Sequence, residues 1–253
     1  VVLRIAVLCG LGWLVFRSRE PVYHGKTLSH WLGIYTSPPR NAFARREAED
    51  AVRHIGTNAI PTLLRMLRAK DSGFTASLIR SLSRQQLLKI RFTGALERNM
   101  QAMNAFATLG ATAKEAVPEL IRIHDQNISW DSRWATVFAL GGIGPAAKEA
   151  IPLLLHGMPN ADQSIRFATV RALGQIHAEP ALVVPVLTDR LQDGDPEVRV
   201  VAASALGQFG ADARPAIPTL RAWLTDKDSR MREAVTSALQ QIDPEAAAKG
   251  GIQ

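Results

Sequence analysis

Arg133…Ala139-Leu140-Gly141 decides the fold, because the same phrase returns at a constant interval along the chain. Its later copies are Arg166…Ala172-Leu173-Gly174, Arg199…Ala205-Leu206-Gly207 and Arg232…Ala238-Leu239-Gln240. A second phrase keeps the same period, at Ile151-Pro152, Val184-Pro185 and Ile217-Pro218, and Val117-Pro118 precedes these slightly out of step. Self-similarity at a fixed period of about 33 residues predicts a solenoid, in which each unit buries its apolar face against the next.

Each unit is predicted to be a pair of antiparallel helices. The first helices are expected over residues 131–141, 163–175, 196–208 and 229–242, where alanines on one face allow neighbouring helices to approach closely. Gly144 and Gly210 follow two of them, at positions where glycine ends a helix with a positive φ. The second helices are expected to begin at the Ile-Pro and Val-Pro steps, because proline is tolerated in a first helical turn. A leucine two residues after each proline is predicted to lie in the core: Leu63, Leu120, Leu154, Leu187 and Leu220.

Aspartates precede three of the repeat arginines by four residues, at Asp162, Asp195 and Asp228. This spacing places each carboxylate at the N-terminus of a predicted helix, where the helix dipole favours a negative charge. It also predicts an ion pair with the arginine one turn later. Because the pattern recurs in successive units, such pairs would form a ladder between neighbours.

Two departures from the period interrupt the array. The interval from Pro61 to Pro118 is too long for one unit and too short for two. Residues 74–92 between them are predicted to be helical, either as a degenerate repeat or as an inserted helix. At the other end, Gly251 stands where the next proline would be, so the solenoid is expected to stop after a half repeat. The polar side chains of that half repeat suit an exposed end cap: Arg230, Glu233, Ser237 and Gln241.

Residues 1–16 (VVLRIAVLCGLGWLVF) are apolar except for Arg4, and residues 1–20 are predicted to form a membrane anchor or signal anchor. As a helix, residues 1–16 would span about 24 Å, which is shorter than the hydrocarbon core, so a buried core helix is the alternative. Small residues that would suit signal-peptide cleavage do not follow, which favours an uncleaved anchor. With such an anchor, the solenoid is expected on the extracytoplasmic side. Cys9 is the single cysteine, which excludes an internal disulfide.

Residues 21–41 are predicted to be a short capping helix followed by a linker. Thr27 suits the N-cap of that helix, and Ser37-Pro38-Pro39-Arg40 would act as a stiff connector. The helix would cover the first repeat with an apolar stripe made by Leu28, Trp31, Leu32 and Tyr35. The solenoid itself is expected over residues 42–247, with an irregular part at 70–100, and a disordered tail over 248–253.

Charge is distributed unevenly along the chain, which carries a net charge of +7. Residues 1–100 hold 16 Lys and Arg against 6 acidic residues, whereas residues 101–253 hold 14 against 17. The basic excess of the first hundred residues could favour anionic lipid, an acidic protein or nucleic acid. The regular repeats are slightly acidic, so they do not predict a continuous phosphate-binding surface.

The phrases Asp-x-x-x-Arg, Ala-Leu-Gly-x-Ile/Phe-Gly and Ala-Ile-Pro-x-Leu together resemble the HEAT repeat over about residues 42–247. The apolar segment followed by Tyr-x-Gly-Lys-x-Leu-x-x-Trp-Leu also resembles uncharacterised membrane-anchored HEAT proteins of bacteria. The resemblance implies an all-α fold: a right-handed α-α superhelix of about five to six helical-hairpin repeats with an N-terminal hydrophobic anchor helix. It implies a surface for binding and specifies no activity.

Chemical motifs are few. The six histidines show no metal-binding spacing, and no metal or cofactor is expected. HEAT-like enzymes that hydroxylate a modified lysine hold iron with His-Glu dipeptides, and this sequence contains none. The predicted function is therefore a non-enzymatic scaffold for protein–protein interaction, presented at a membrane through residues 1–16. A HEAT-like enzyme, similar to a bilin lyase or a DNA glycosylase, is the alternative.

Some candidate residues for binding a protein partner come from the second helices, which line the concave side in the family resembled, and others come from the basic first half of the chain. The fourth and fifth residues after each helix-starting proline sample that side, and neither set carries charges of one sign. Nucleic acid is therefore not the expected partner. Trp130 and Trp134 flank a repeat arginine and suit an interface anchor, with core packing as the alternative. The predicted binding residues are Arg65, Arg68, Arg84, Lys89, Arg91, Arg122, Trp130, Trp134, His156, Arg190 and Trp223.

Overall fold

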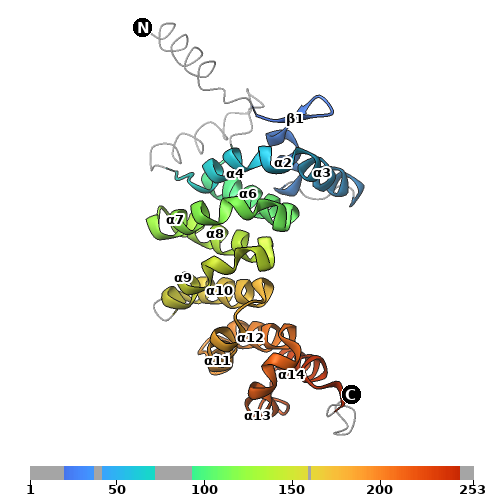
Figure 1. Cartoon of the computed structure of the whole chain (residues 1–253), viewed down its shortest axis with the longest axis vertical. Coiled ribbons are helices and arrows are strands. Elements are labelled where there is room, and N and C mark those ends of the chain that lie inside the picture. The colour runs from blue at the N-terminus through green and yellow to red at the C-terminus, as the bar shows by residue number, and fades with distance from the viewer. Residues whose placement is uncertain (1–19, 37–41, 72–92, 159–160, 246–253) are drawn as a thin grey trace, which may run out of the picture.

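A stack of helical hairpins forms the body of the protein (Figure 1). The computed structural model describes residues 20–36, 42–71, 93–158 and 161–245. In the described part, the stack contains five hairpins followed by one further helix. They are α3 (Ala42–Ile55) with α4 (Ile60–Leu67), α6 (Ala95–Leu109) with α7 (Val117–Gln126), α8 (Trp130–Ile143) with α9 (Ile151–Gly157), α10 (Gln163–Ile176) with α11 (Pro180–Arg190), α12 (Pro196–Gln208) with α13 (Ile217–Arg221), and α14 (Ser229–Ile242). The predicted solenoid is confirmed, and its first helices lie where the repeat places them.

Short 3-10 segments join the two helices of most hairpins. They are η1 (Gly56–Ala59), η2 (Gly110–Ala116), η3 (Gly144–Ala150) and η5 (Gly210–Ala216). Each begins with a glycine of positive φ, as predicted for Gly144 and Gly210. At Gly144 the pair φ 74° and ψ −146° belongs to a region that essentially only glycine occupies. The glycine therefore fixes where the chain reverses.

The fourth hairpin departs from this pattern. The expectation that its second helix begins at Val184-Pro185 is wrong, since α11 begins at Pro180. No glycine follows α10, and His177 and Glu179 take left-handed conformations instead. Pro180 then occupies the first helical turn, where its missing N–H costs nothing, so the helix starts early and carries Pro185 inside it.

A short helix packs on the first hairpin. The helix α2 (Leu28–Thr36) buries Leu28, Trp31 and Leu32, and it packs against α3 and α6. Thr27 caps it, since its Oγ1 accepts a hydrogen bond of 3.4 Å from the N–H of His30. A two-stranded antiparallel hairpin, β1 (Val22–Tyr23) with β2 (Lys26–Thr27), precedes this helix and is a small addition to the predicted all-α fold. Its turn at His24-Gly25 has positive φ at both residues, which suits a tight hairpin.

The long interval between Pro61 and Pro118 lies between two hairpins that touch each other. The helices α3 and α4 both contact α6, and η1 contacts η2. The hairpin α3–α4 and the hairpin α6–α7 are therefore direct neighbours in the stack. The predicted helix at 74–92 lies outside the described residues, as do the anchor at 1–16, the connector at 37–40 and the tail at 248–253.

One stretch in the described part, Trp130–Gly157, has the length and mean hydropathy (1.3) of a membrane span. It comprises α8, η3 and α9, so it folds as a hairpin of the solenoid rather than as one straight helix. Half of its most apolar 18-residue window is buried inside the protein. Core packing thus accounts for its apolar composition.

The core runs along the stack between the two layers of helices. All five leucines of the predicted column are at most 2% exposed. Glycines of the Ala-Leu-Gly phrase lie against alanines of the next repeat. A Cβ on Gly141 would lie 2.9 Å from the Cα of Ala172, and one on Gly174 would lie 2.9 Å from the Cβ of Ala205. Consecutive first helices therefore meet backbone to backbone.

The predicted pairing of Asp162, Asp195 and Asp228 with the arginines at i+4 is wrong. Each aspartate instead accepts hydrogen bonds from backbone N–H groups of the first helical turn, which fixes its carboxylate at the N-cap. The arginine side chains bind carbonyl groups just before the cap: Arg166 that of Ala161, Arg199 those of Asp193 and Gly194, and Arg232 those of Asp226 and Lys227. The arginines thus hold the inter-repeat loops rather than the caps.

Asp193 provides the buried anion that the sequence patterns did not single out. Its side chain is 3% exposed and accepts two hydrogen bonds from Arg166, of 2.9 and 2.8 Å, while Arg190 lies 3.5 Å away. Burial by itself would raise the pKa of Asp193, but hydrogen bonds from Arg166 and from the N–H of Asp195 outweigh it and hold the pKa below its usual value. The ion pair ties α10 to the loop that leads into α12.

We expect Gly174→Ala to destabilise the protein by about 1–3 kcal/mol, because the new methyl group overlaps Ala205 of the next repeat. Gly33→Ala in α2 is the matched control, since a Cβ there meets no atom within 4 Å. That control should gain up to about 1 kcal/mol from its better helix propensity. Chemical unfolding measures both changes, and shifts of the same sign would contradict the proposed contact.

Candidate functional site

Three aromatic side chains form a row along α8. Trp130 stacks on Trp134 with ring centroids 6.1 Å apart and an interplanar angle of 15°, and Trp134 lies 4.5 Å from the ring of Phe138. The indole N–H of Trp130 donates a hydrogen bond of 3.0 Å to Asp162, which holds the ring in place. Trp130 nevertheless remains 49% exposed. A rigid aromatic surface that is open to solvent is typical of an anchor for a protein partner.

The surface next to this aromatic row continues onto α10 and α12. The guanidinium of Arg171 lies 5.5 Å from the centre of the Phe138 ring. Trp134 and Phe167 line a hollow of about 280 Å³, together with the acidic residues Asp195 and Glu197. The residues equivalent to Trp134 in the next two repeats are Phe167 and Val200, and all three side chains are half-buried. The apolar surface therefore spans three repeats.

Several of the predicted binding residues are instead engaged within the protein. Arg68 and Arg122 both form ion pairs with Glu119, and the pair with Arg68 connects the end of α4 with α7. Arg190 lies beside the buried Asp193. Charged groups with such partners offer less to a ligand than their sequence positions suggest. Arg84, Lys89 and Arg91 lie outside the described residues.

Trp223 and His156 do not belong to the aromatic row, since Trp223 follows α13 and His156 lies on α9. Trp223 is half-buried beneath the guanidinium of Arg199, at 5.5 Å from the ring centre, and it lines a hollow of about 660 Å³. Its indole nitrogen is buried and has no hydrogen-bond partner in the described part. His156 is exposed on α9. Among the predicted residues that the structure describes, Trp130 stacks on Trp134, and Arg68 and Arg122 meet at Glu119.

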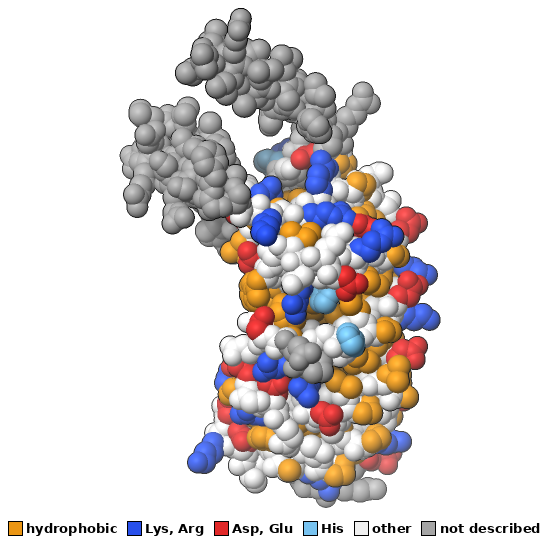
Figure 2. All heavy atoms as spheres, turned by 90° about the vertical axis from the view of Figure 1, so that its left-hand side faces the viewer, with side chains coloured by type: hydrophobic (Ala, Val, Ile, Leu, Met, Phe, Trp, Pro, Cys, Tyr) orange, Lys and Arg blue, Asp and Glu red, His pale blue; other side chains and the backbone are white. Residues whose placement is uncertain are grey.

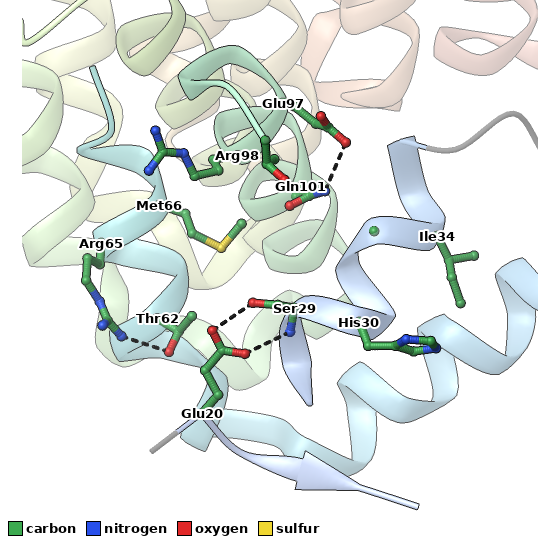
Figure 3. Close-up of a pocket in the computed structure, with 12 residues that line it drawn as sticks. Glu20, Ser29, His30, Ile34, Thr62, Arg65, Met66, Glu97, Arg98 and Gln101 are labelled. Carbon is green, nitrogen blue, oxygen red and sulfur yellow. Dashed lines mark hydrogen bonds between the residues drawn. The ribbon is translucent and has the colours of Figure 1, made fainter. Parts of the chain in front are cut away.

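Arg65 lines a pocket of about 560 Å³ between α2, α4 and α6 (Figure 3). Its guanidinium donates a hydrogen bond of 3.1 Å to Thr62. On the opposite wall, Ser29 donates to Glu20 through both its hydroxyl and its backbone N–H. Figure 3 shows the ring of His30 pointing away from this pair, so Ser29 has no imidazole base beside it. Both polar and apolar side chains line the pocket, and in the described part its serine has no histidine base.

Metal ligation and phosphate binding find little support in the described residues. No group of three or more His, Cys, Asp or Glu side chains there could hold a metal ion. Figure 2 shows the side of the molecule that carries α7, α9 and α11, and acidic side chains lie among the basic ones on it. That face offers no continuous positive surface for a nucleic-acid backbone.

The side chain of His124 on α7 is 11% exposed and lies close to Arg133, and its Nδ1 lies 3.8 Å from a carboxylate oxygen of Asp125, too far for a hydrogen bond. Burial, followed by the charge of Arg133, lowers its pKa below the ordinary value, while Asp125 opposes this effect. The unfolded chain therefore binds a proton at a higher pH than the folded protein does. The contribution of His124 to stability is fully present above pH about 6.5, and it is lost as the pH falls toward the pKa of His124 in the folded protein.

We expect His124→Leu to remove this part of the pH dependence. Between pH about 7 and about 5, the free energy of unfolding should fall less steeply in the variant than in the parent protein. Urea unfolding at several pH values measures the two slopes. Parallel curves for the two proteins would contradict a lowered pKa at His124.

Comparison with known proteins identifies the repeat. A family model described as HEAT repeats matches residues 117–193 and 184–249. No curated protein matches the chain. Among solved structures, a designed armadillo repeat protein in complex with the peptide (KR)4 is similar, with a TM-score of 0.52 and 15% identity over 85% of this chain and 99% of its own. Another designed armadillo repeat protein has a TM-score of 0.46 and 17% identity, over 85% of this chain and 100% of its own.

These matches agree with the architecture seen in Figure 1. The family model spans more than half of the 253 residues, and its matched region runs from the start of α7 to beyond α14. The likeness to the designed protein shows a shared fold, in which helical hairpins stack into a solenoid. The chain belongs to the HEAT-repeat family.

Proposed function

We propose that this protein is a non-enzymatic scaffold that binds a protein partner and is held at a membrane surface by residues 1–16. The repeat-solenoid fold is typical of protein-binding scaffolds. The designed armadillo repeat protein of similar fold is itself in complex with a peptide, which supports a polypeptide as the ligand class.

The observation that carries the proposal is the exposed tryptophan of the aromatic row. Trp130 keeps half of its surface open to solvent although stacking on Trp134 and the hydrogen bond to Asp162 hold it rigidly. Ordering a side chain on binding costs entropy, so a ring that is already fixed binds more tightly than a mobile one. Tryptophan is also among the residues that contribute most to protein interfaces.

Partner binding is tested with the full-length chain. Proximity labelling in cells supplies candidate partners, and isothermal titration calorimetry then measures each purified candidate against the chain. We expect Trp130→Ala to weaken binding of the true partner by about tenfold or more, because an interface anchor is lost.

The matched control for this test is Leu96→Ala on α6, because Leu96 is also an apolar side chain that is 49% exposed. It should leave the affinity nearly unchanged. Equal losses in both variants, or no loss in either, would contradict the aromatic row as the binding surface.

Membrane presentation rests on the apolar residues 1–16, and we propose that they span the membrane with the solenoid on the extracytoplasmic side. We expect the full chain to sediment with membranes and to require detergent for release. A chain lacking residues 1–20 should remain in the supernatant with its helical content intact. A full-length chain found in the soluble fraction would contradict the anchor.

A further inference from the structure

A groove lies where α11 meets η5, the 3-10 segment of the next repeat. Its volume is about 590 Å³, within the range of small-ligand sites. Three prolines and two carboxylates define it, and we name it the proline groove: Pro180, Pro185, Pro215, Asp189 and Asp212. Val184 and Ala181 complete its apolar lining.

This groove arises from the irregular fourth hairpin. Because α11 starts at Pro180, an additional helical turn stands where the other hairpins have a 3-10 segment that begins with glycine. That turn and Pro185 form one wall, and Pro215 of the next repeat contributes to the other. The groove is thus built by the one second helix in the described part that does not begin at its Ile-Pro or Val-Pro step.

Acceptor groups dominate the polar part of the proline groove. In the described part of the chain, the carboxylates of Asp189 and Asp212 have no hydrogen-bond or ion-pair partner, and both residues are exposed. Pro185 has no N–H to donate to the carbonyl of Ala181 four residues earlier, so that carbonyl lacks its regular helical partner. No lysine or arginine lines the groove. Two negative charges therefore lie beside an apolar wall, and no cation among the described residues of the groove neutralises them.

We infer that the proline groove binds the side chain of a lysine or arginine from a basic segment of a partner protein. The aliphatic part of such a side chain packs on the prolines and Val184, while its charged end reaches Asp189 and Asp212. An anionic ligand would be repelled, and a wholly apolar one would cover the two carboxylates without replacing their water. Charge complementarity thus selects a cation that carries an apolar stem.

This surface is separate from the aromatic row, which lies on α8 and uses none of the same residues. If the proline groove does not bind basic side chains, the proposed role of Trp130 is unaffected. If Trp130→Ala does not weaken partner binding, the proposal for the proline groove is unaffected. The proline groove would thus be a second contact surface of the scaffold, one that accepts a basic segment.

The test uses the full-length chain in a non-ionic detergent and a fluorescein-labelled octapeptide of alternating Lys and Ser. Fluorescence anisotropy should show saturable binding that weakens as salt is added, because the contact is between charges. A peptide in which Gln replaces each Lys should bind at least about tenfold more weakly. The double variant Asp189→Asn, Asp212→Asn should lose affinity for the Lys peptide by a similar factor.

A second variant, Ala181→Arg, places a cation of the protein's own at the edge of the groove and should also weaken binding. The side chain of Ala181 is exposed, so replacing it leaves the core unchanged. The control is Glu115→Gln, Glu149→Gln, which removes the same charge from two exposed positions in η2 and η3. That control should bind the Lys peptide within about twofold of the parent.

Several results would overturn the inference. They are a loss of affinity in the control equal to that of the Asp variant, equal binding of the Gln and Lys peptides, and no saturable binding of the Lys peptide. Concentration-dependent association of the chain that Ala181→Arg abolishes would also overturn it, because a second copy would then be the occupant. Circular dichroism of each variant checks that the solenoid is intact.

Discussion

Backbone-to-backbone contact between consecutive first helices is the constraint on which the solenoid depends. Gly141 and Gly174 each lie against an alanine of the next repeat, at distances that leave no room for a methyl group. Because no side chain separates the helices there, the spacing from one repeat to the next is set at these points. The buried leucines and the glycine-led 3-10 turns then fall into register, since each occupies the same place in its unit.

The two surfaces proposed to bind partners lie where the repeat pattern is broken. Position 134 is tryptophan in α8, but its equivalent in α14 is Glu233, so the apolar surface ends within the stack. The fourth hairpin replaces the turn glycine with His177 and starts its second helix early, which creates the proline groove. Regular repeats satisfy their own packing and leave little exposed, whereas these departures leave an indole and two carboxylates open to a partner.

Sequence reasoning found part of the candidate site. The spacing of Trp130 and Trp134, one turn apart on a predicted helix, was sufficient to place the two rings together. Arg68 and Arg122 were predicted as free binding residues, but both form ion pairs with Glu119. The pair with Arg68 is not predictable from local spacing, because Arg68 is distant in the sequence from that carboxylate. Asp193 was not predicted as a structural residue. Its pattern is nevertheless present in the sequence, because Asp193-Gly194-Asp195 and Asp226-Lys227-Asp228 recur in successive repeats, and in each the first aspartate accepts a hydrogen bond from the N–H of the second.

The sequence by itself determined the helical hairpins, most of their boundaries, the buried leucines and the family, because these follow from a period that each unit repeats locally. Only the tertiary structure decided which charges are engaged and which are open. Ion pairs such as Arg166 with Asp193 depend on how a helix and a later loop meet in space, and no local spacing encodes that distance. The exposure of Trp130 and the shape of the proline groove are likewise consequences of how one repeat packs on the next.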